Sequence, residues 1–457
     1  MRNFCMVIAK HRINLNTMQY RLILYSFLSL FLTTQIEAQI DTVKQDKGQL
    51  VDGKKIGRWH EYDSLGRLKA VGDYKADRKN GIWNYYYPTK TLREIVTYEN
   101  DVKNGKYAIF DSTGLLLREA QYVKGVLNGY FMEYYENGTI ALKGYYKQNI
   151  KDSTWIEYQP NGYKRLIEEY KNGKADGEWV LFYENGNLKS IENYKDGIED
   201  GRWRIFYEFP QIWKEFHYKQ GSLDSTYVEF HKGGTKSVIG QYKNDFKSGT
   251  WKNYYPDGKL FAIGNYQNGL KSAIWKYFDD EGILNEEGPF VADRRNGQWI
   301  EYYQSGNIEY VGSYVNGNRD GLWGRFHPNE QLMQEQEWSS GKLQTVGPYY
   351  HINGETLPLG TYENGQGKLL TYHTDGTVKS KKSYANGLAN GLYESTYPGG
   401  TPREKGQYTN GLKTGKWTSY HNTGRIASLG EYVKGQKTGR WRFYSKRGKL
   451  ISVRNFE

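Results

Sequence analysis

Residues 177–200 read GEWVLFYENGNLKSIENYKDGIED and contain the unit that decides the fold. If Gly177 is numbered repeat position 1, that position recurs every 24 residues from Gly57 onward, and only the copy that begins at Thr345 is shorter, with 22 residues. Seventeen copies run from Gly57 to the carboxyl end, after a lead-in and partial copy in residues 39–56. A fixed period of this length indicates a repeat architecture.

Aromatic residues occupy fixed positions of the unit. Position 18 is aromatic in all seventeen copies, and position 6 is aromatic in sixteen. In a strictly alternating strand positions 3 and 6 point to opposite faces, so either both faces carry rings or a bulge brings the two positions together. Position 3 holds eleven of the thirteen tryptophans, which we expect to form the structural framework: Trp59, Trp83, Trp155, Trp179, Trp203, Trp251, Trp275, Trp299, Trp323, Trp417 and Trp441.

The residues between the aromatic runs predict turns. Position 21 is always Gly, Asp or Asn, as at Gly173, Gly197 and Gly269. These residue types tolerate a positive φ best, so we expect a left-handed turn residue there. Pairs such as Asn185-Gly186 follow the aromatic run of positions 2–8, and this arrangement is typical of hairpins. Each repeat is therefore predicted to be one two-stranded hairpin with its glycines at turns, and the absence of a 3.6-residue period argues against helix.

A single hairpin is marginally stable in water, so the repeats must stack. The predicted fold is all-β: an elongated single-sheet solenoid of about 17 stacked 24-residue hairpins. We expect regular arrays in residues 57–344 and 367–457, separated by an irregular repeat in residues 345–366. Because that repeat is short and carries Gly347-Pro348, a kink is expected at about residues 338–368.

The amino end resembles an export signal. Arg21 precedes LILYSFLSLFL at residues 22–32, which is too short to span a bilayer but fits the apolar region of a signal peptide. The small residue Ala38 then predicts cleavage after it, giving a signal peptide of residues 1–38, with Met18 as an alternative start. We expect a periplasmic, outer-membrane-associated or extracellular protein; an uncleaved amphipathic anchor is the alternative.

Composition and motifs argue against an enzyme. The single cysteine, Cys5, lies in the predicted signal, so the mature chain has no disulfide, cysteine zinc site or thiol nucleophile. Gly-x-Ser-x-Gly, phosphate-loop and His-Glu-x-x-His motifs are missing from the sequence. We therefore predict a non-enzymatic protein without a cofactor. The net charge of +12 is mild for this length and predicts no nucleic-acid partner.

Five of the eight histidines share position 7: His231, His327, His351, His373 and His421. One interpretation is a ladder of metal ligands along the array. Equivalent positions in stacked hairpins would lie roughly 9.6 Å apart, however, whereas two histidine nitrogens on one zinc ion must approach within about 3–4 Å. We therefore favour an aromatic position that tolerates imidazole, and we predict no metal site.

Basic residues recur at position 23, and stacking is expected to align them along one edge of the sheet. This strip could bind an anionic partner such as lipid headgroups or acidic glycans. The alternative is a solvated edge that discourages strand pairing. The candidate partner-binding residues are Lys79, Lys103, Lys151, Lys247, Lys271, Arg295, Arg319, Lys413 and Lys437.

Residues 170–179, YKNGKADGEW, resemble the core of MORN-type repeats, and more closely their bacterial variant in antitoxin-like proteins. The resemblance recurs through residues 50–457 and implies a β-hairpin repeat protein. This chain departs from the original motif at its Tyr-x-Gly step and has Trp179 where that motif has glycine. The resemblance implies binding to a protein or to an anionic membrane surface, and also an antitoxin-like neutralising role.

The sequence is compatible with two functions. The first is an exported scaffold that displays a long surface to an unknown protein partner at or outside the cell envelope. The second is a binder of glycans or the envelope surface, in which exposed rings at position 3 or 6 stack on sugars. Burial of those rings would leave no surface for a sugar, so ring exposure distinguishes the two.

Overall fold

The computed structural model describes residues 43–457, so the predicted signal peptide and its cleavage site after Ala38 lie outside the described residues. All regular elements of residues 43–457 are β-strands. This part of the chain contains no helix with the length and apolar character needed to cross a membrane. The expected all-β class is confirmed.

One hydrogen-bonded sheet contains the first 29 strands. Their bounds are β1 (Lys47–Val51), β2 (Lys54–Tyr62), β3 (Leu68–Lys75), β4 (Arg78–Tyr86), β5 (Leu92–Glu99), β6 (Val102–Phe110), β7 (Leu116–Val123), β8 (Val126–Tyr134), β9 (Ile140–Lys147), β10 (Ile150–Tyr158), β11 (Lys164–Lys171), β12 (Lys174–Ala175), β13 (Gly177–Phe182), β14 (Leu188–Lys195), β15 (Ile198–Glu199), β16 (Gly201–Phe206), β17 (Ile212–Lys219), β18 (Ser222–Phe230), β19 (Lys236–Lys243), β20 (Phe246–Tyr254), β21 (Leu260–Gln267), β22 (Leu270–Phe278), β23 (Leu284–Val291), β24 (Arg294–Arg295), β25 (Gly297–Tyr302), β26 (Ile308–Val315), β27 (Asn318–Phe326), β28 (Leu332–Ser339) and β29 (Lys342–Val346).

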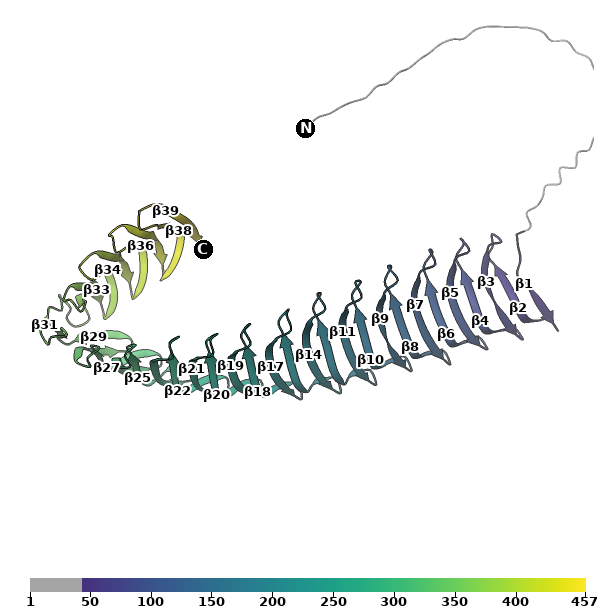
Figure 1. Cartoon of the computed structure of the whole chain (residues 1–457), viewed down its shortest axis with the longest axis horizontal. Helices are drawn as coiled ribbons and strands as arrows, with labels where there is room; N and C mark the ends of the chain where they lie inside the picture. The colour runs from purple at the N-terminus through teal and green to yellow at the C-terminus, as the bar shows by residue number, and fades with distance from the viewer. Residues whose placement is uncertain (1–42) are drawn as a thin grey trace, which may run out of the picture.

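Two further sheets follow. The first is the two-stranded pair β30 (Tyr349–Tyr350) and β31 (Thr356–Leu357). The second comprises β32 (Gly367–Tyr372), β33 (Val378–Ala385), β34 (Leu388–Thr396), β35 (Pro402–Thr409), β36 (Leu412–Tyr420), β37 (Ile426–Val433), β38 (Gln436–Tyr444) and β39 (Leu450–Phe456). The hydrogen-bonded array is thus interrupted between Val346 and Gly367, and Figure 1 shows the molecule bending there.

Each repeat contributes two antiparallel strands, and each strand pairs with its neighbours in sequence. In the repeat that begins at Gly249, β20 pairs with β21, and β21 pairs in turn with β22 of the next repeat. The result is a continuous meander drawn out into a long, curved, single-layer array (Figure 1). The elongated single-sheet solenoid expected from the sequence is therefore confirmed.

Two turns of different length connect the strands. The short turn consists of positions 20 and 21, and in the pair Asp196-Gly197 both residues have a positive φ, of 52° and 90°. Positive φ at both central residues defines a turn whose twist matches that of the flanking strands. The left-handed conformation expected at position 21 is confirmed, whereas that of position 20 was not anticipated. The long turn spans positions 7–11 and lies at the opposite edge of the array.

Bulges decide which side chains share a face. Between β21 and β22, Ile263 pairs with Lys276 and Asn265 with Ser272, so the single residue Gly264 lies opposite three residues of β22. Positions 3, 5, 14, 16 and 18 consequently share one face, which we call the ladder face. Positions 2, 4, 6, 15 and 17 share the other, which we call the open face. Positions 3 and 6 therefore lie on opposite faces, and both faces carry aromatic rings.

Candidate functional site

The tryptophans of position 3 build the ladder face. The indole of Trp275 lies against Gly264 in the preceding strand, and its Nε1–H donates to the carbonyl oxygen of Asn265 at 3.1 Å. The bulge at Gly264 breaks the strand pairing at this point, so the indole supplies a donor to that carbonyl. All eleven tryptophans of position 3 donate to the carbonyl ten residues earlier.

The tyrosines of position 18 fill the spaces between successive tryptophans. The Tyr266 ring lies edge-on between Trp251 and Trp275, with centroid distances of 5.6 and 5.3 Å. Edge-to-face packing of this kind is the favoured arrangement of aromatic pairs. Since the sheet has no second layer, this lateral packing between repeats provides the core, and Trp83, Trp275 and Trp299 are 0–1% exposed.

Two members of the expected framework depart from this pattern. Trp179 and Trp203 are only partly buried, because Glu168 and Glu192 stand at position 16, where most repeats have glycine. The Trp179 ring packs on its tyrosine neighbours at tilted angles of 54° and 49°. These two tryptophans therefore bury less of their surface in the core than the other nine.

The nine basic residues expected to form an edge strip follow the short turns of their repeats, and their side chains lie on the ladder face. Each extends over the position-3 ring of its own strand, with Lys271 Nζ 4.3 Å from the Trp275 ring and the Arg295 guanidinium 3.9 Å from the Trp299 ring. Both Lys247 and Lys271 are partly buried, and this burial lowers the pKa of their ammonium groups. The same contact is made by Lys79, Lys103, Lys151, Lys247, Arg319, Lys413 and Lys437. These cations are thus parts of the ladder, bound to rings of their own chain.

The histidines of position 7 link consecutive repeats along the long-turn edge. His231 Nε2 hydrogen-bonds the Tyr254 carbonyl at 2.9 Å, and in a neighbouring repeat the Tyr255 hydroxyl donates to the Phe278 carbonyl at 3.0 Å. Imidazole and phenol therefore perform the same task, which explains their exchange at this position. The remaining four make the equivalent bond: His327, His351, His373 and His421. Residues 43–457 contain no cluster of three or more metal-ligating side chains.

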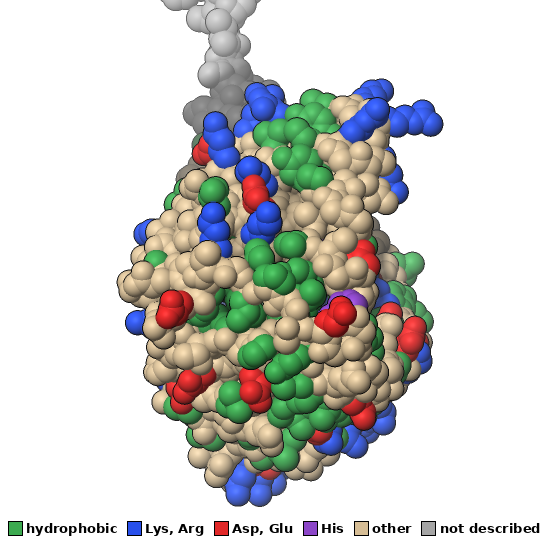
Figure 2. All heavy atoms as spheres, turned by 90° about the vertical axis from the view of Figure 1, so that its left-hand side faces the viewer, with side chains coloured by type: hydrophobic (Ala, Val, Ile, Leu, Met, Phe, Trp, Pro, Cys, Tyr) green, Lys and Arg blue, Asp and Glu red, His purple; other side chains and the backbone are tan. Residues whose placement is uncertain are grey.

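The open face offers a different chemistry. Position 2 points away from the ladder and is polar or charged in most repeats. In four repeats it leaves a large apolar side chain in solvent, with exposed fractions of 58% at Ile82, 56% at Ile274, 62% at Leu322 and 50% at Leu392. Ion pairs such as Arg202–Glu215, joined at 2.5 Å, lie among them. Figure 2 shows apolar side chains exposed in the middle of the surface seen from the bend, with charged groups around them.

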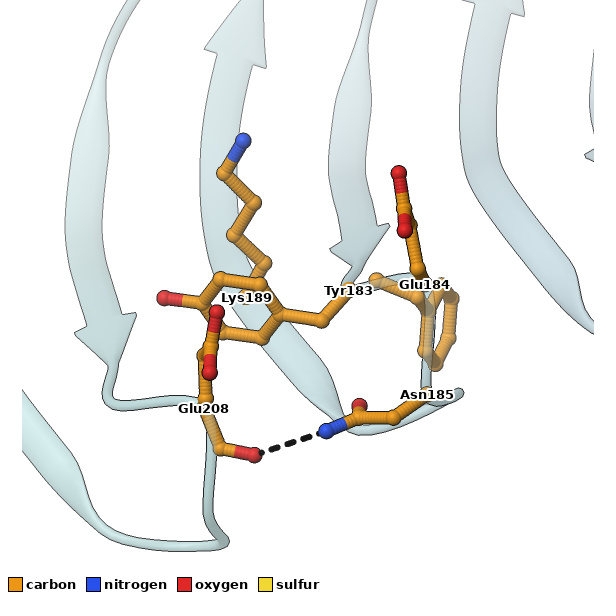
Figure 3. Close-up of a pocket in the computed structure, with 6 residues that line it drawn as sticks. Tyr183, Glu184, Asn185, Lys189 and Glu208 are labelled. Atoms are coloured by element: carbon orange, nitrogen blue, oxygen red, sulfur yellow. Dashed lines mark hydrogen bonds between the residues drawn. The ribbon is translucent and has the colours of Figure 1, made fainter.

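Hollows in the surface occur at the long-turn edge and at the bend. One of about 550 Å³ is lined by Tyr183, Lys189 and Glu208 (Figure 3), and its Asn185 side chain donates to the Glu208 carbonyl at 3.2 Å. Since the Tyr183 hydroxyl also donates to the Phe206 carbonyl, the polar groups here mainly connect stacked loops. A second hollow, of about 250 Å³, lies at the bend, where Arg325 forms an ion pair with Glu309 at 3.1 Å.

Comparisons with known proteins agree with this geometry. The family model described as the MORN repeat variant matches six segments: residues 79–100, 127–148, 175–196, 247–268, 295–316 and 365–386. Each match begins next to the short turn, with a basic residue at Lys79, Lys247 and Arg295, and ends at position 20 of the following repeat, so it spans both strands of one hairpin and the long turn between them. Curated proteins include no match to this chain.

Solved structures give only distant matches. The chain aligns with the crystal structure of TcdB2-TccC3-Cdc42 at 11% identity over 87% of this chain and 26% of that one, with a TM-score of 0.15. A Tc holotoxin pore of Photorhabdus luminescens aligns at 11% identity over 88% and 26%, with a TM-score of 0.16. The chain thus spans about a quarter of the length of these chains, and superposition this poor carries no argument. The repeat matches and the hairpin geometry together show that the chain is a MORN-type repeat protein, built from the variant repeat.

Proposed function

We propose that this protein is a non-enzymatic, exported scaffold that binds a protein partner through its open face, at or outside the cell envelope. MORN-type repeats serve generally as scaffolds for proteins or membranes. The observation that carries the proposal is the exposure of the apolar side chains Ile274 and Leu322 at position 2, two repeats apart on one continuous single-layer surface. Exposed apolar groups rimmed by charges are typical of protein interaction sites.

The ladder face is the less suitable surface for a partner. Its tryptophans are buried and its position-23 cations already contact rings of the same chain. The glycan alternative needs solvent-facing rings, and at position 3 that surface is missing in Trp83, Trp275 and Trp299. The antitoxin-like role remains an expectation drawn from the family resemblance.

Capture experiments with matched variants test the open face. The chain from residue 39 onward is immobilised and exposed to envelope extracts, with a double variant Ile274→Lys and Leu322→Lys beside it. A partner of the open face should bind the wild type and be lost from this variant. The control is Phe246→Lys with Leu270→Lys, which charges two apolar residues of the short-turn edge that are 57% and 43% exposed. Loss of the partner from the control alone would contradict the proposal.

Export is tested separately. The basic Arg21, the apolar residues 22–32 and the small Ala38 support cleavage after Ala38. Amino-terminal sequencing of the native protein should give Gln39 as the first residue. A native chain that retains residues 18–38 would contradict export by cleavage.

A further inference from the structure

The net charge of the chain changes sign across the bend. Residues 367–457, which we call the basic arm, carry 17 Lys and Arg against 5 Asp and Glu, a net charge of +12 that equals the net charge of the whole chain. Residues 273–366, which we call the acidic arm, carry 6 Lys and Arg against 14 Asp and Glu, a net charge of −8. Two neighbouring arms of strongly opposite charge therefore meet at the bend.

The two arms also match in size and in layout. Each arm consists of four repeats, so charged groups on both recur with the same spacing of roughly 10 Å along the sheet. Asp280 and Glu281 occupy positions 8 and 9 of a long turn in the acidic arm, and Lys446 and Arg447 occupy the same two positions in the basic arm. All four side chains are exposed.

The open face repeats this contrast. In the basic arm Lys416 and Arg440 stand exposed at position 2, whereas in the acidic arm Glu335 stands exposed at position 15 of the same face. In Figure 2, Lys and Arg side chains gather at the top of the surface seen from the bend and also lie at its bottom and sides, and Asp and Glu side chains lie around its middle and lower parts.

Within one chain the arms touch at the bend, where Lys379 of the basic arm lines a hollow together with Glu309 and Arg325 of the acidic arm. All ion pairs of the described residues in this region lie within one arm, as Arg319–Glu301 and Arg325–Glu309 do on the acidic side and Lys405–Glu394 and Lys413–Glu404 on the basic side. Figure 1 shows β33–β39 curving away from β25–β29 at the bend. The exposed charges of each arm are therefore available to another molecule.

We propose that the occupant of these surfaces is a second copy of this chain, joined as a twofold dimer in which the basic arm of each copy lies along the acidic arm of the other. A twofold axis at the bend brings each arm onto its opposite, because in such a dimer a contact of patch i with patch j is repeated as j with i. Four repeats of strands about 30 Å long give about 1,200 Å² per arm, which is sufficient for a specific interface. Ile274 and Leu322 of the proposed partner surface also lie in the acidic arm, so the dimer and a partner would share part of that surface. A wild type that is monomeric at low salt would overturn the dimer alone, and loss of partner capture would bear on the proposed function alone.

The test is the mass of the protein in solution as a function of salt. Charge pairs across such an interface act over a Debye length of about 20 Å at 20 mM salt and about 4 Å at 500 mM. Light scattering after gel filtration should give twice the chain mass at low salt and the chain mass at high salt. A wild type that is monomeric at low salt overturns the proposal, and so does a dimer that persists unchanged at high salt.

Charge reversal identifies the surfaces. Glu330, in a long turn of the acidic arm, is exposed like the other residues chosen. The basic-arm variant (Lys416→Glu, Arg440→Glu, Lys446→Glu, Arg447→Glu) and the acidic-arm variant (Asp280→Lys, Glu281→Lys, Glu330→Lys, Glu335→Lys) should each be monomeric at low salt. Mixed together they should form a dimer again, because each then offers the complement of the other. This recovery separates a lost contact from a lost fold, and its failure overturns the proposal.

A third variant tests whether charge alone is responsible. Lys232→Glu, Lys236→Glu, Lys243→Glu and Lys252→Glu make the same change of charge on exposed lysines of β18–β20 and their turns, outside both arms. This variant should still dimerise at low salt. If it is as monomeric as the basic-arm variant, general electrostatic attraction explains the dimer and the proposed pairing of arms is wrong. Binding of a polyanion such as dextran sulfate by a wild type that stays monomeric would assign the basic arm to another occupant.

Discussion

Gly264 leaves the space that Trp275 fills: a Cβ atom at Gly264 would lie 2.1 Å from Cδ2 of the indole ring. The same relation joins a glycine at position 16 to the tryptophan eleven residues later in nine of the eleven cases. Where position 16 has a side chain, the next position 3 often has a smaller ring, as in Val96 with Tyr107. The two positions therefore form one packing unit across the boundary between repeats.

The first prediction tests this unit. Gly264→Val should destabilise the array by on the order of 1–3 kcal/mol, because the new side chain overpacks against the indole. Adding Trp275→Tyr should recover part of the loss, since Val with Tyr is a combination that the chain already uses. Urea unfolding of both single variants and the double variant gives the coupling energy. The control combines Gly264→Val with the remote change Trp417→Tyr. In this double variant the losses in unfolding free energy of the two single variants should simply add.

The second prediction ranks the tryptophans by burial. Trp83→Ala should cost ~3–5 kcal/mol, the usual loss for a large buried aromatic residue. Trp179→Ala should cost clearly less, because that ring is partly exposed beside Glu168. Contacts in a repeat array are local, so hydrogen exchange should rise around β3–β5 in the Trp83 variant and stay unchanged near Trp441. Equal losses for the two substitutions would show that burial does not set the energy.

The third prediction concerns the short turn. Gly197 has φ of 90°, where a β-branched residue is strained. Gly197→Val should therefore cost on the order of 1–3 kcal/mol, and Gly197→Asn much less, although the two side chains are similar in size. Thermal or urea unfolding of the two variants compares them directly. If both are equally harmful, space and not backbone conformation limits this position.

The fourth prediction concerns pH at the bend. Hydrogen bonds to the Asn353 side chain and the Thr374 carbonyl raise the pKa of the His351 imidazole, because both of its nitrogens then act as donors. A raised folded-state pKa stabilises the fold below the unfolded value of about 6.5, and the gain is lost as pH rises through the higher folded value. NMR titration should thus give His351 in the folded protein a higher pKa than histidine in an unfolded peptide. Asn353→Ala should lower the pKa of His351. A value at or below that of the peptide would contradict the assignment.

Most of the fold could be predicted because the same local sequence pattern recurs in every repeat. The period of 24, the choice of Gly, Asp or Asn at position 21 and the aromatic positions all describe local backbone or strand geometry. The contact of position 23 with the rings could not be predicted, since the bulge that brings Lys271 over Trp275 depends on pairing with the preceding repeat. The role of Gly264 was missed because glycines were expected only at turns, although its spacing from Trp275 is visible in the sequence.

The sequential pairing of strands has a mechanical consequence. Because each hairpin of the long sheet is bonded only to its neighbours in the chain, a pull along the array can detach one hairpin without breaking bonds elsewhere. Each 24-residue unit would release about 80 Å of extended chain in place of roughly 10 Å of folded length. The protein would then lengthen under load in many small, equal steps, and it would shorten again by re-pairing adjacent strands. A tether of this kind absorbs tension while most of its binding surface stays folded.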